Sequence, residues 1–368
     1  MKILIIKLGA LGDVINTFPL VVNMKKYFNA EIDWLVAPLS YSLVANHPCV
    51  DHAILFDKNN LRHSLPSALK KIRAKRYDIT LDLQRILKSA FFSMAAKSCK
   101  RIGFNRERCK EMTWLFPFDR IPPSDPKAHM LNQYLEFAAY LNIPLSEVSW
   151  MIPRTFKKEF GLPDRYLVLN IGASRPVKQW APDNFAALAD KIDEKFHLQT
   201  VLTGGPEDIK IGKDICDKTV CNTIDLTGKT SIPQIVEVIA NARCVISCDT
   251  GAMHLASALG IDLIALFGPT DPRRTGPFKG RVIQKKFSCT PCNKKKCKEP
   301  RCMDEIKPED VWYVLETQCL DIQGNNKVWS EIPKDFLITG VEDSIMGISQ
   351  FAKGSLKKKL VNCKVVFE

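Results

Sequence analysis

The chain has no long uncharged apolar segment, since its most hydrophobic stretch, residues 244–267, is interrupted by Asp249, His254 and Asp262. A membrane-spanning helix needs roughly 18 or more nearly uncharged apolar residues, so we expect no such helix. The composition excludes disorder, collagen and coiled coil as descriptions of the whole chain, and no short-period repeat is present. The Gly-x-Gly-x-x-Gly series of dinucleotide-binding turns is also missing, which argues against a nicotinamide-dependent oxidoreductase.

What the chain does have is the composition of a globular protein, with 46% hydrophobic residues, 25% charged residues and a mean hydropathy of −0.09. Its 368 residues correspond to two domains at roughly 150 residues each. Strand-like apolar runs alternate with helical patterns in two series, one starting at Met1 and one near residue 160, which indicates parallel sheets covered by helices. We therefore predict an α/β protein with two doubly wound Rossmann-like domains, residues 1–155 and 156–320, facing across a cleft. Residues 321–368 would form an appendage without an assigned role.

Positive charge is in excess, with 53 Lys and Arg against 40 Asp and Glu and a net charge of +13. Such an excess indicates an anionic partner, which could be a nucleic acid, an anionic membrane face or a phosphorylated substrate. We expect no nucleic-acid partner, because no recognition motif or basic–aromatic interleaving is present. The 13 cysteines are odd in number and come without an export signal, so we expect reduced thiols in a cytoplasmic protein.

A tight turn with Gly9 and Gly12 follows the first predicted strand and ends at Asp13. Ligands bind at the carboxyl ends of the strands in such sheets, so the Asp13 carboxylate is well placed to act as a general base. Capping of the first helix is the alternative role for this residue, because Asp is favoured at that position.

Three further turns, each after a predicted strand, carry groups suited to an anionic ligand. Ser174, Arg175 and Lys178 follow one strand and could contact a diphosphate, or could belong to a solvated basic loop. Thr250 and Gly251 lie where a helix begins and offers free amides to a phosphate. Asp249 and His254 flank this turn, although His254 could equally be a buried structural histidine. Glu207 or Asp208 could hold sugar hydroxyls, and together these turns predict a site for a nucleotide-diphosphate donor.

Four cysteines lie close together, at Cys289, Cys292, Cys297 and Cys302. Four thiolates at this spacing could bind zinc tetrahedrally or hold an iron–sulfur cluster as a structural clip. Reduced thiols or a redox disulfide are the alternatives, because only the first pair has Cys-x-x-Cys spacing. The surrounding lysines are expected to lower the pKa of these thiols.

The motifs together resemble the ADP-heptose:lipopolysaccharide heptosyltransferases, glycosyltransferase family 9, over about residues 1–318. The segments that carry the resemblance are Lys7–Val14, Gly172–Ser174 with Lys178 and Trp180, Gly204–Pro206, Asp249–His254 and Phe267–Pro272. The Asp-Thr-Gly-x-x-His and Gly-Pro-Thr-Asp-Pro pair is quite specific at this separation. The Cys-x-Pro-Cys segment also looks like one found in many members of the family.

The resemblance implies a GT-B fold, with the acceptor bound to the N-terminal domain and the nucleotide sugar to the C-terminal domain. Asp13 matches the family's catalytic base, which would deprotonate the acceptor hydroxyl for an inverting in-line attack. Ser174 and Lys178 match residues that bind the donor diphosphate without a divalent ion, so no cofactor would be required for catalysis. Thr250, Gly251 and His254 match the phosphate-binding turn, Asp249 a residue near the donor sugar, and Glu207 an acidic donor-site residue unless the alignment slips to Asp208. Position 10 is Ala where some members carry a serine near the acceptor.

On this resemblance we expect transfer of heptose from ADP-L-glycero-D-manno-heptose to the lipopolysaccharide inner core. The partners would be ADP-heptose, an anionic lipid-linked saccharide acceptor and the cytoplasmic face of the inner membrane, where the protein would be peripheral. The alternative is a family 9 enzyme that uses another nucleotide sugar or acts on another glycan or a protein. Five basic residues are candidates for membrane docking, or else form an ordinary solvated helix face: Lys70, Lys71, Arg73, Lys75 and Arg76.

Overall fold

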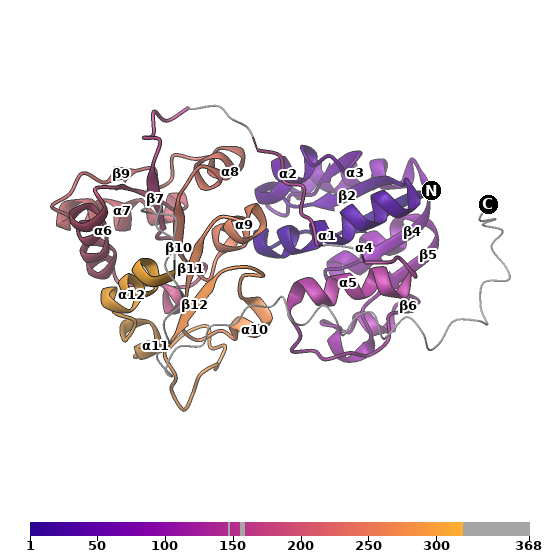
Figure 1. The fold of residues 1–368 in the computed structure, drawn as a ribbon. Helices are drawn as coiled ribbons and strands as arrows, with labels where there is room; N and C mark the ends of the chain where they lie inside the picture. Colours follow the sequence, from indigo (N-terminus) through magenta and orange to yellow (C-terminus); the bar gives the residue numbers. More distant parts are fainter. Residues whose placement is uncertain (146–147, 155–158, 319–368) are drawn as a thin grey trace. The chain divides into compact units, whose positions relative to one another are not determined.

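The computed structural model describes residues 1–145, 148–154 and 159–318. It contains two compact units, the first ending at Pro153 and the second beginning at Arg154 (Figure 1). Each unit is built on a six-stranded sheet in which all the neighbouring strands are parallel. The predicted pair of α/β domains with parallel sheets is thereby confirmed. The expected appendage, residues 321–368, lies outside the described residues.

The sheet of unit 1 has the strand order β3-β2-β1-β4-β5-β6. Its strands are β1 (Lys2–Ile6), β2 (Glu31–Val36), β3 (His52–Leu55), β4 (Arg76–Asp82), β5 (Lys97–Gly103) and β6 (Asp119–Arg120). The order reverses direction between β1 and β4, and ligands of doubly wound sheets bind at this switch point, beyond the carboxyl ends of the strands. The turns that follow β1 and β4 therefore form the expected site of this unit.

Helices cover both faces of this sheet because neighbouring residues of a buried strand point to opposite sides. The helices are α1 (Leu11–Phe28), α2 (Pro38–Ala45), α3 (Leu61–Arg73), α4 (Leu87–Ala95) and α5 (Met130–Tyr140). Leu4 and Ile6 of β1 share a core cluster with Ala68 of α3 and Phe92 of α4. On the other side α1 packs against α5. This packing brings the middle of α5 beside the first turn of α1, although the two are far apart in the sequence.

Unit 2 repeats the same topology, with the strand order β12-β11-β10-β7-β8-β9. Its strands are β7 (Tyr166–Asn170), β8 (Gln199–Thr203), β9 (Ile224–Asp225), β10 (Cys244–Cys248), β11 (Leu263–Phe267) and β12 (Arg281–Gln284). Its helices are α6 (Pro182–Phe196), α7 (Ile209–Lys218), α8 (Ile232–Ala240), α9 (Gly251–Leu259), α10 (Pro272–Thr275), α11 (Arg301–Asp304) and α12 (Pro308–Gln318). The switch point lies between β7 and β10, so the turns after these two strands are the expected site.

The cores of both units are apolar, and β7, β10 and β11 are buried along their whole length. Such continuous burial is typical of parallel strands covered on both faces. None of the helices in the described ranges combines the length and the apolar character that crossing a membrane would require.

Candidate functional site

The first cluster of functional side chains surrounds Asp13, in the first turn of α1. Lys7 Nζ lies 3.0 Å from Asp13 Oδ2, and the Tyr134 hydroxyl donates a hydrogen bond of 3.2 Å to Asp13 Oδ1. Lys7 Nζ also lies 5.2 Å from the centre of the Tyr134 ring. The N-cap of α1 is Ala10, so Asp13 lies inside the helix rather than at its cap. Its carboxylate is held by an ammonium and a phenol while a third of the side chain stays exposed.

Lys7 is an unusual partner because its side chain is 2% exposed. Burial lowers the pKa of Lys7 below its ordinary value, and the adjacent Asp13 carboxylate opposes that shift. The turn that follows β4 fixes the backbone beside it: Gln84 Oε1 accepts hydrogen bonds from the amides of Leu8 and Gly9. The two turns of the unit 1 switch point are thus joined, and the carboxylate they present can accept a proton from a bound hydroxyl.

In unit 2 the turns after β7 and β10 are joined in a similar way. Asn170 Nδ2 donates to both Ser247 Oγ and Thr250 Oγ1, each at 3.1 Å. Thr250 is the N-cap of α9, and Gly251 is the first residue of that helix. The amino end of α9 therefore lies at the unit 2 switch point, where its free amides and dipole favour an anion. His254, in the same helix, is buried.

Lys178 and Asp249 form an ion pair at this place, with Lys178 Nζ 2.6 Å from Asp249 Oδ2. The same oxygen accepts a hydrogen bond of 2.7 Å from Thr270 Oγ1, and both partners of the ion pair are largely buried. Gln284 fixes the loop of Thr270 by donating to the carbonyl oxygens of Gly268 and Thr270. Ser174 is exposed in the turn after β7. The structure thus brings Lys178, Asp249 and Thr250 together.

The two acidic residues after β8, Glu207 and Asp208, lie in different surroundings. Asp208 is buried and accepts a hydrogen bond from the Gly205 amide, and burial raises the pKa of its carboxyl. Gly172 packs so closely against it that a Cβ atom there would lie 2.6 Å from Asp208 Oδ2. Asp208 therefore stabilises the turn, whereas the exposed Glu207 is the one of the pair that solvent and ligands can reach.

The four cysteines considered as possible metal ligands do not reach ligand spacing among the residues that the structure describes. In the described part of the chain, three or more potential ligand atoms lie within 4.8 Å of one another only at Glu31, Asp33 and His52. Every described cysteine is a free thiol, and Cys289 and Cys297 are exposed. The segment as it stands does not fit a tetrahedral metal site.

The expected lowering of the thiol pKa by lysines is wrong for Cys302. Burial and the neighbouring Cys292 and Cys289 thiols raise the pKa of Cys302 to about 11, because both disfavour a thiolate.

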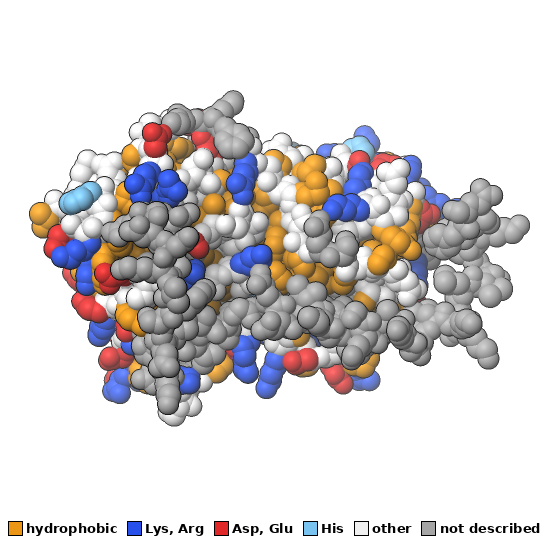
Figure 2. Space-filling view, in the orientation of Figure 1, with side chains coloured by type: hydrophobic (Ala, Val, Ile, Leu, Met, Phe, Trp, Pro, Cys, Tyr) orange, Lys and Arg blue, Asp and Glu red, His pale blue; other side chains and the backbone are white. Residues whose placement is uncertain are grey.

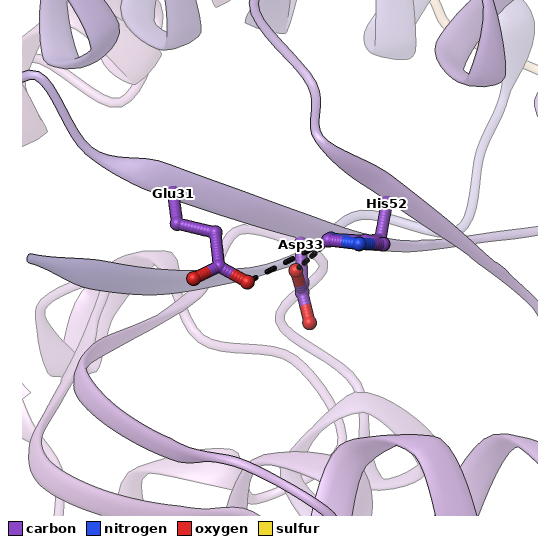
Figure 3. Close-up of side chains that lie close together, drawn as sticks. All are labelled: Glu31, Asp33 and His52. Carbon is purple, nitrogen blue, oxygen red and sulfur yellow. Dashed lines mark hydrogen bonds and ion pairs between the residues drawn. The ribbon is translucent and has the colours of Figure 1, made fainter.

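The group Glu31, Asp33 and His52 lies at the amino ends of β2 and β3, where the three side chains point toward one another (Figure 3). Lys75 Nζ occupies the space between them, 2.6 Å from Glu31 Oε1 and 3.0 Å from Asp33 Oδ1. Burial alone would lower the pKa of Lys75, but the bonds to the two carboxylates raise it. The group is therefore an ion-pair network centred on an ammonium rather than a cation site.

This network also corrects the prediction for Lys75, which is bound to carboxylates instead of being available for docking. Lys70, Lys71, Arg73 and Arg76 are exposed at the end of α3 and the start of β4. They lie at the amino edge of the sheet, opposite the edge that carries Asp13. On the face drawn in Figure 2, Lys and Arg side chains are scattered among acidic and hydrophobic ones.

Several residues of these clusters were not predicted from the sequence. Tyr134 is 121 positions from Asp13, and nothing in its local pattern indicates the contact. Asn170 and Gln84 are ordinary polar residues at or after strand ends. Thr270 could have been found, because it belongs to the Phe267–Pro272 motif.

Comparison with known proteins identifies the family of the chain. A family model described as glycosyltransferase family 9 (heptosyltransferase) matches residues 66–303. The lipopolysaccharide core heptosyltransferase OpsX of Haemophilus influenzae is 26% identical over 285 residues, which are 74% of this chain and 81% of that protein. Lipopolysaccharide heptosyltransferase 1 of Pseudomonas aeruginosa is 25% identical over 355 residues, 87% of this chain and 98% of that protein.

Among solved structures, ADP-heptose LPS heptosyltransferase II of Escherichia coli superposes with a TM-score of 0.71 and 26% identity, covering 87% of this chain and 99% of the other. The two parallel-sheet units and this likeness confirm the expected GT-B fold. Because the family model matches well over half of its length, the chain belongs to glycosyltransferase family 9 and is a glycosyltransferase enzyme.

Proposed function

We propose that this enzyme transfers heptose from ADP-L-glycero-D-manno-heptose to the inner core of lipopolysaccharide. The observation that carries the proposal is the Asp13 carboxylate, held by Lys7 and Tyr134 at the switch point of unit 1. The names of the relatives supply the sugar and the acceptor class, since they are lipopolysaccharide heptosyltransferases.

In the proposed reaction Asp13 removes the proton from an acceptor hydroxyl as its oxygen attacks the anomeric carbon of the heptose. The bond between that carbon and the diphosphate breaks on the opposite side, so the configuration is inverted and ADP leaves with the bonding electrons. General-base catalysis requires the carboxylate to be ionised, and the adjacent Lys7 ammonium favours this state.

The donor diphosphate is proposed to bind in unit 2, at Lys178 and the amino end of α9. Thr250 and Gly251 begin this helix, Ser174, His254 and Asp249 are proposed to bind the donor with them, and the exposed Glu207 is available to the sugar hydroxyls. Lys178 is paired with Asp249 in the structure, so a bound diphosphate has to compete with or share that partner. The lysine and the helix dipole supply positive charge directly, and no step of the proposed reaction uses a divalent ion or the cysteine segment.

Calorimetry without acceptor tests the donor assignment, comparing ADP-heptose with UDP-, GDP- and CMP-sugars. We expect selective binding of ADP-heptose and a loss of affinity of roughly tenfold or more in Lys178→Ala, because a charge-assisted contact is removed. Lys195→Ala is the matched control, since Lys195 is an exposed lysine of the same unit paired with Glu194. Preference for another nucleotide sugar would refute the heptose assignment, and binding of none of them would refute the donor site.

We also propose peripheral contact with an anionic membrane surface, through the carboxyl edge of unit 1. Helices that follow parallel strands begin at this edge, and α3 and α4 present Leu61 and Leu87 there, each 49% exposed. The neighbouring Arg62 and Lys88 are exposed as well. Apolar and basic side chains in this combination suit an anionic lipid interface, and this edge also carries the proposed base.

Sedimentation with vesicles of phosphatidylglycerol or phosphatidylcholine checks this contact. We expect binding to the anionic vesicles that weakens with salt and falls several-fold in Arg62→Glu/Lys88→Glu, at about 1 kcal/mol for each basic residue removed. Lys70→Glu/Lys71→Glu, at the opposite edge, is expected to lose less. The reverse order would move the contact to the end of α3, and equal binding to both lipids would contradict an electrostatic contact.

A further inference from the structure

Arg85 is a buried arginine for which no ion pair with a carboxylate is found in the described ranges. The residue follows β4 in the turn of the unit 1 switch point and is 8% exposed. Its Nε atom is buried without a hydrogen-bond partner, and its guanidinium lies 4.8 Å from the centre of the Phe104 ring. The Asp82 carboxylate nearby accepts hydrogen bonds from the backbone amides of Gln84 and Arg85 and not from this guanidinium.

The two neighbouring arginines, Arg108 and Arg120, both have hydrogen-bond partners for their guanidinium groups. Arg108 packs against the same Phe104 ring, and its guanidinium lies 2.5 Å from Glu136 and also bonds to Asn105. Arg120 donates to the carbonyl oxygens of Phe104, Thr113 and Phe116. A buried charge is costly unless it is paired, so Arg85, with its Nε buried and without a partner, lacks the compensation that its neighbours have.

Arg85 also belongs to the immediate surroundings of Asp13. The preceding residue, Gln84, bonds to the amides of Leu8 and Gly9 in the turn that leads to Asp13. Phe104, against which Arg85 packs, is in edge contact with Tyr134, the residue that bonds to Asp13. The backbone amide of Lys110 bonds to the Arg85 carbonyl oxygen, and the charges of both residues act on Lys7, the partner of Asp13.

We propose that Arg85 is an anion-binding residue that recognises a carboxylate or phosphate group of the acceptor beside the reacting hydroxyl. The inference rests on the proposed function, because it takes unit 1 as the acceptor side. A planar guanidinium can hold either group through two parallel hydrogen bonds, and both groups would neutralise the buried charge. The acceptor anion thus supplies the partner that the described residues do not provide, and it orients the acceptor over Asp13.

The test measures anion binding separately from transfer, in a Lys178→Ala background so that the proposed donor residues do not contribute. Inorganic phosphate and glucuronate are the two probes, and their effects on Tm and their heats of binding are recorded. We expect at least one of them to stabilise the protein and its affinity to fall roughly tenfold or more in Arg85→Met. Stabilisation by phosphate alone or glucuronate alone identifies which acceptor group is bound.

Arg76→Met is the matched control, because Arg76 is an exposed arginine at the other end of β4. Without ligand, Arg85→Met is expected to keep the Tm of its background or to raise it, since an unpaired buried charge is removed. A lower Tm together with unchanged anion binding would show that Arg85 only supports the packing of Phe104, and would overturn the proposal. An absence of binding by both anions would overturn it as well.

Arg85→Lys provides the test should Arg85→Met fail to fold. It keeps the charge without the two-pronged geometry, so weaker anion binding is expected, and unchanged binding would contradict the proposal. In otherwise wild-type protein, Arg85→Met is expected to raise the KM for the acceptor while leaving ADP binding in unit 2 intact. Failure of the donor assignment would show as lost selectivity for ADP-heptose in the wild type, which is a separate readout.

Discussion

Asp13→Asn is expected to lower the rate of transfer by roughly 10²- to 10⁴-fold, the usual contribution of a general base. Asparagine keeps the shape of the side chain, and its one oxygen can still accept from Lys7 while its amide nitrogen donates to the Tyr134 hydroxyl, but it cannot take up the proton of the acceptor hydroxyl. Binding of ADP should be unchanged, since its proposed site lies in unit 2. The measurement is turnover with saturating donor, alongside calorimetry with ADP.

Asp51→Asn is the matched control for this loss. Asp51 is also a partly exposed aspartate of unit 1 in an ion pair with a lysine, its Oδ2 lying 2.7 Å from Lys25 Nζ. It should retain normal turnover. Near-normal transfer by Asp13→Asn would mean that the carboxylate only supports the first turn of α1, and another base would have to be sought.

Lys7→Met is expected to lower transfer by roughly 100-fold and to change its pH dependence. The ammonium 3.0 Å from Asp13 positions the carboxylate and favours its ionised form, and a misplacement of about 1 Å at a reacting group can reduce a rate by that factor. Without the ammonium a charge that favours the ionised carboxylate is lost, so the acidic limb of the pH–rate profile should move to higher pH.

Lys7→Met should not lower the stability of the protein as it lowers the transfer rate, so the two measurements separate a catalytic role of Lys7 from a structural one. Burial lowers the pKa of Lys7, so the unfolded chain holds this proton more firmly than the folded protein does. The charged lysine therefore lowers stability, and this loss is relieved as the pH rises through the folded-state pKa. Methionine fills the same space without charge, so we expect a Tm close to that of the wild type or above it.

Lys25→Met is the control for the Lys7 variant, because it removes a lysine that pairs with Asp51 in the same unit. Its pH–rate profile should match that of the wild type. An unchanged profile in Lys7→Met, together with a lower Tm, would show that Lys7 is a structural group only.

Strands that are buried on both faces could be predicted from the sequence, but the largely exposed strand β5 could not. β1, β7, β10 and β11 are continuous apolar runs, which is how parallel central strands read. β5 contains Lys97, Lys100 and Arg101, and only its last two residues are buried. Its place in the sheet depends on pairing with β4, which local hydrophobicity does not encode.

The candidate sites divide in the same way. Residues directly after strands, such as Asp13 and Asp249, could be assigned to a binding edge of the sheet, because the carboxyl ends of parallel strands all lie at the same edge. The contact of Tyr134 with Asp13 depends on how α5 packs against α1, which no local pattern reports.

The cysteine spacing left a metal site, reduced thiols and a redox disulfide open for a related reason. Proximity in the sequence says little about where the side chains of a turn point, and Cys289 and Cys297 end up exposed. Lys75 was misjudged because its partners Glu31 and Asp33 are more than forty residues away.

The repeated strand order of the two units affects how substitutions can alter the substrate specificity of such an enzyme. Each half has its own switch point, one with the proposed base and the other with the proposed diphosphate residues. Substitutions that reshape one half need not disturb the packing of the other, because each sheet has its own core. Substitutions can therefore change the specificity for the sugar donor and the specificity for the acceptor independently. A family with this architecture can contain enzymes that differ in one specificity and share the other.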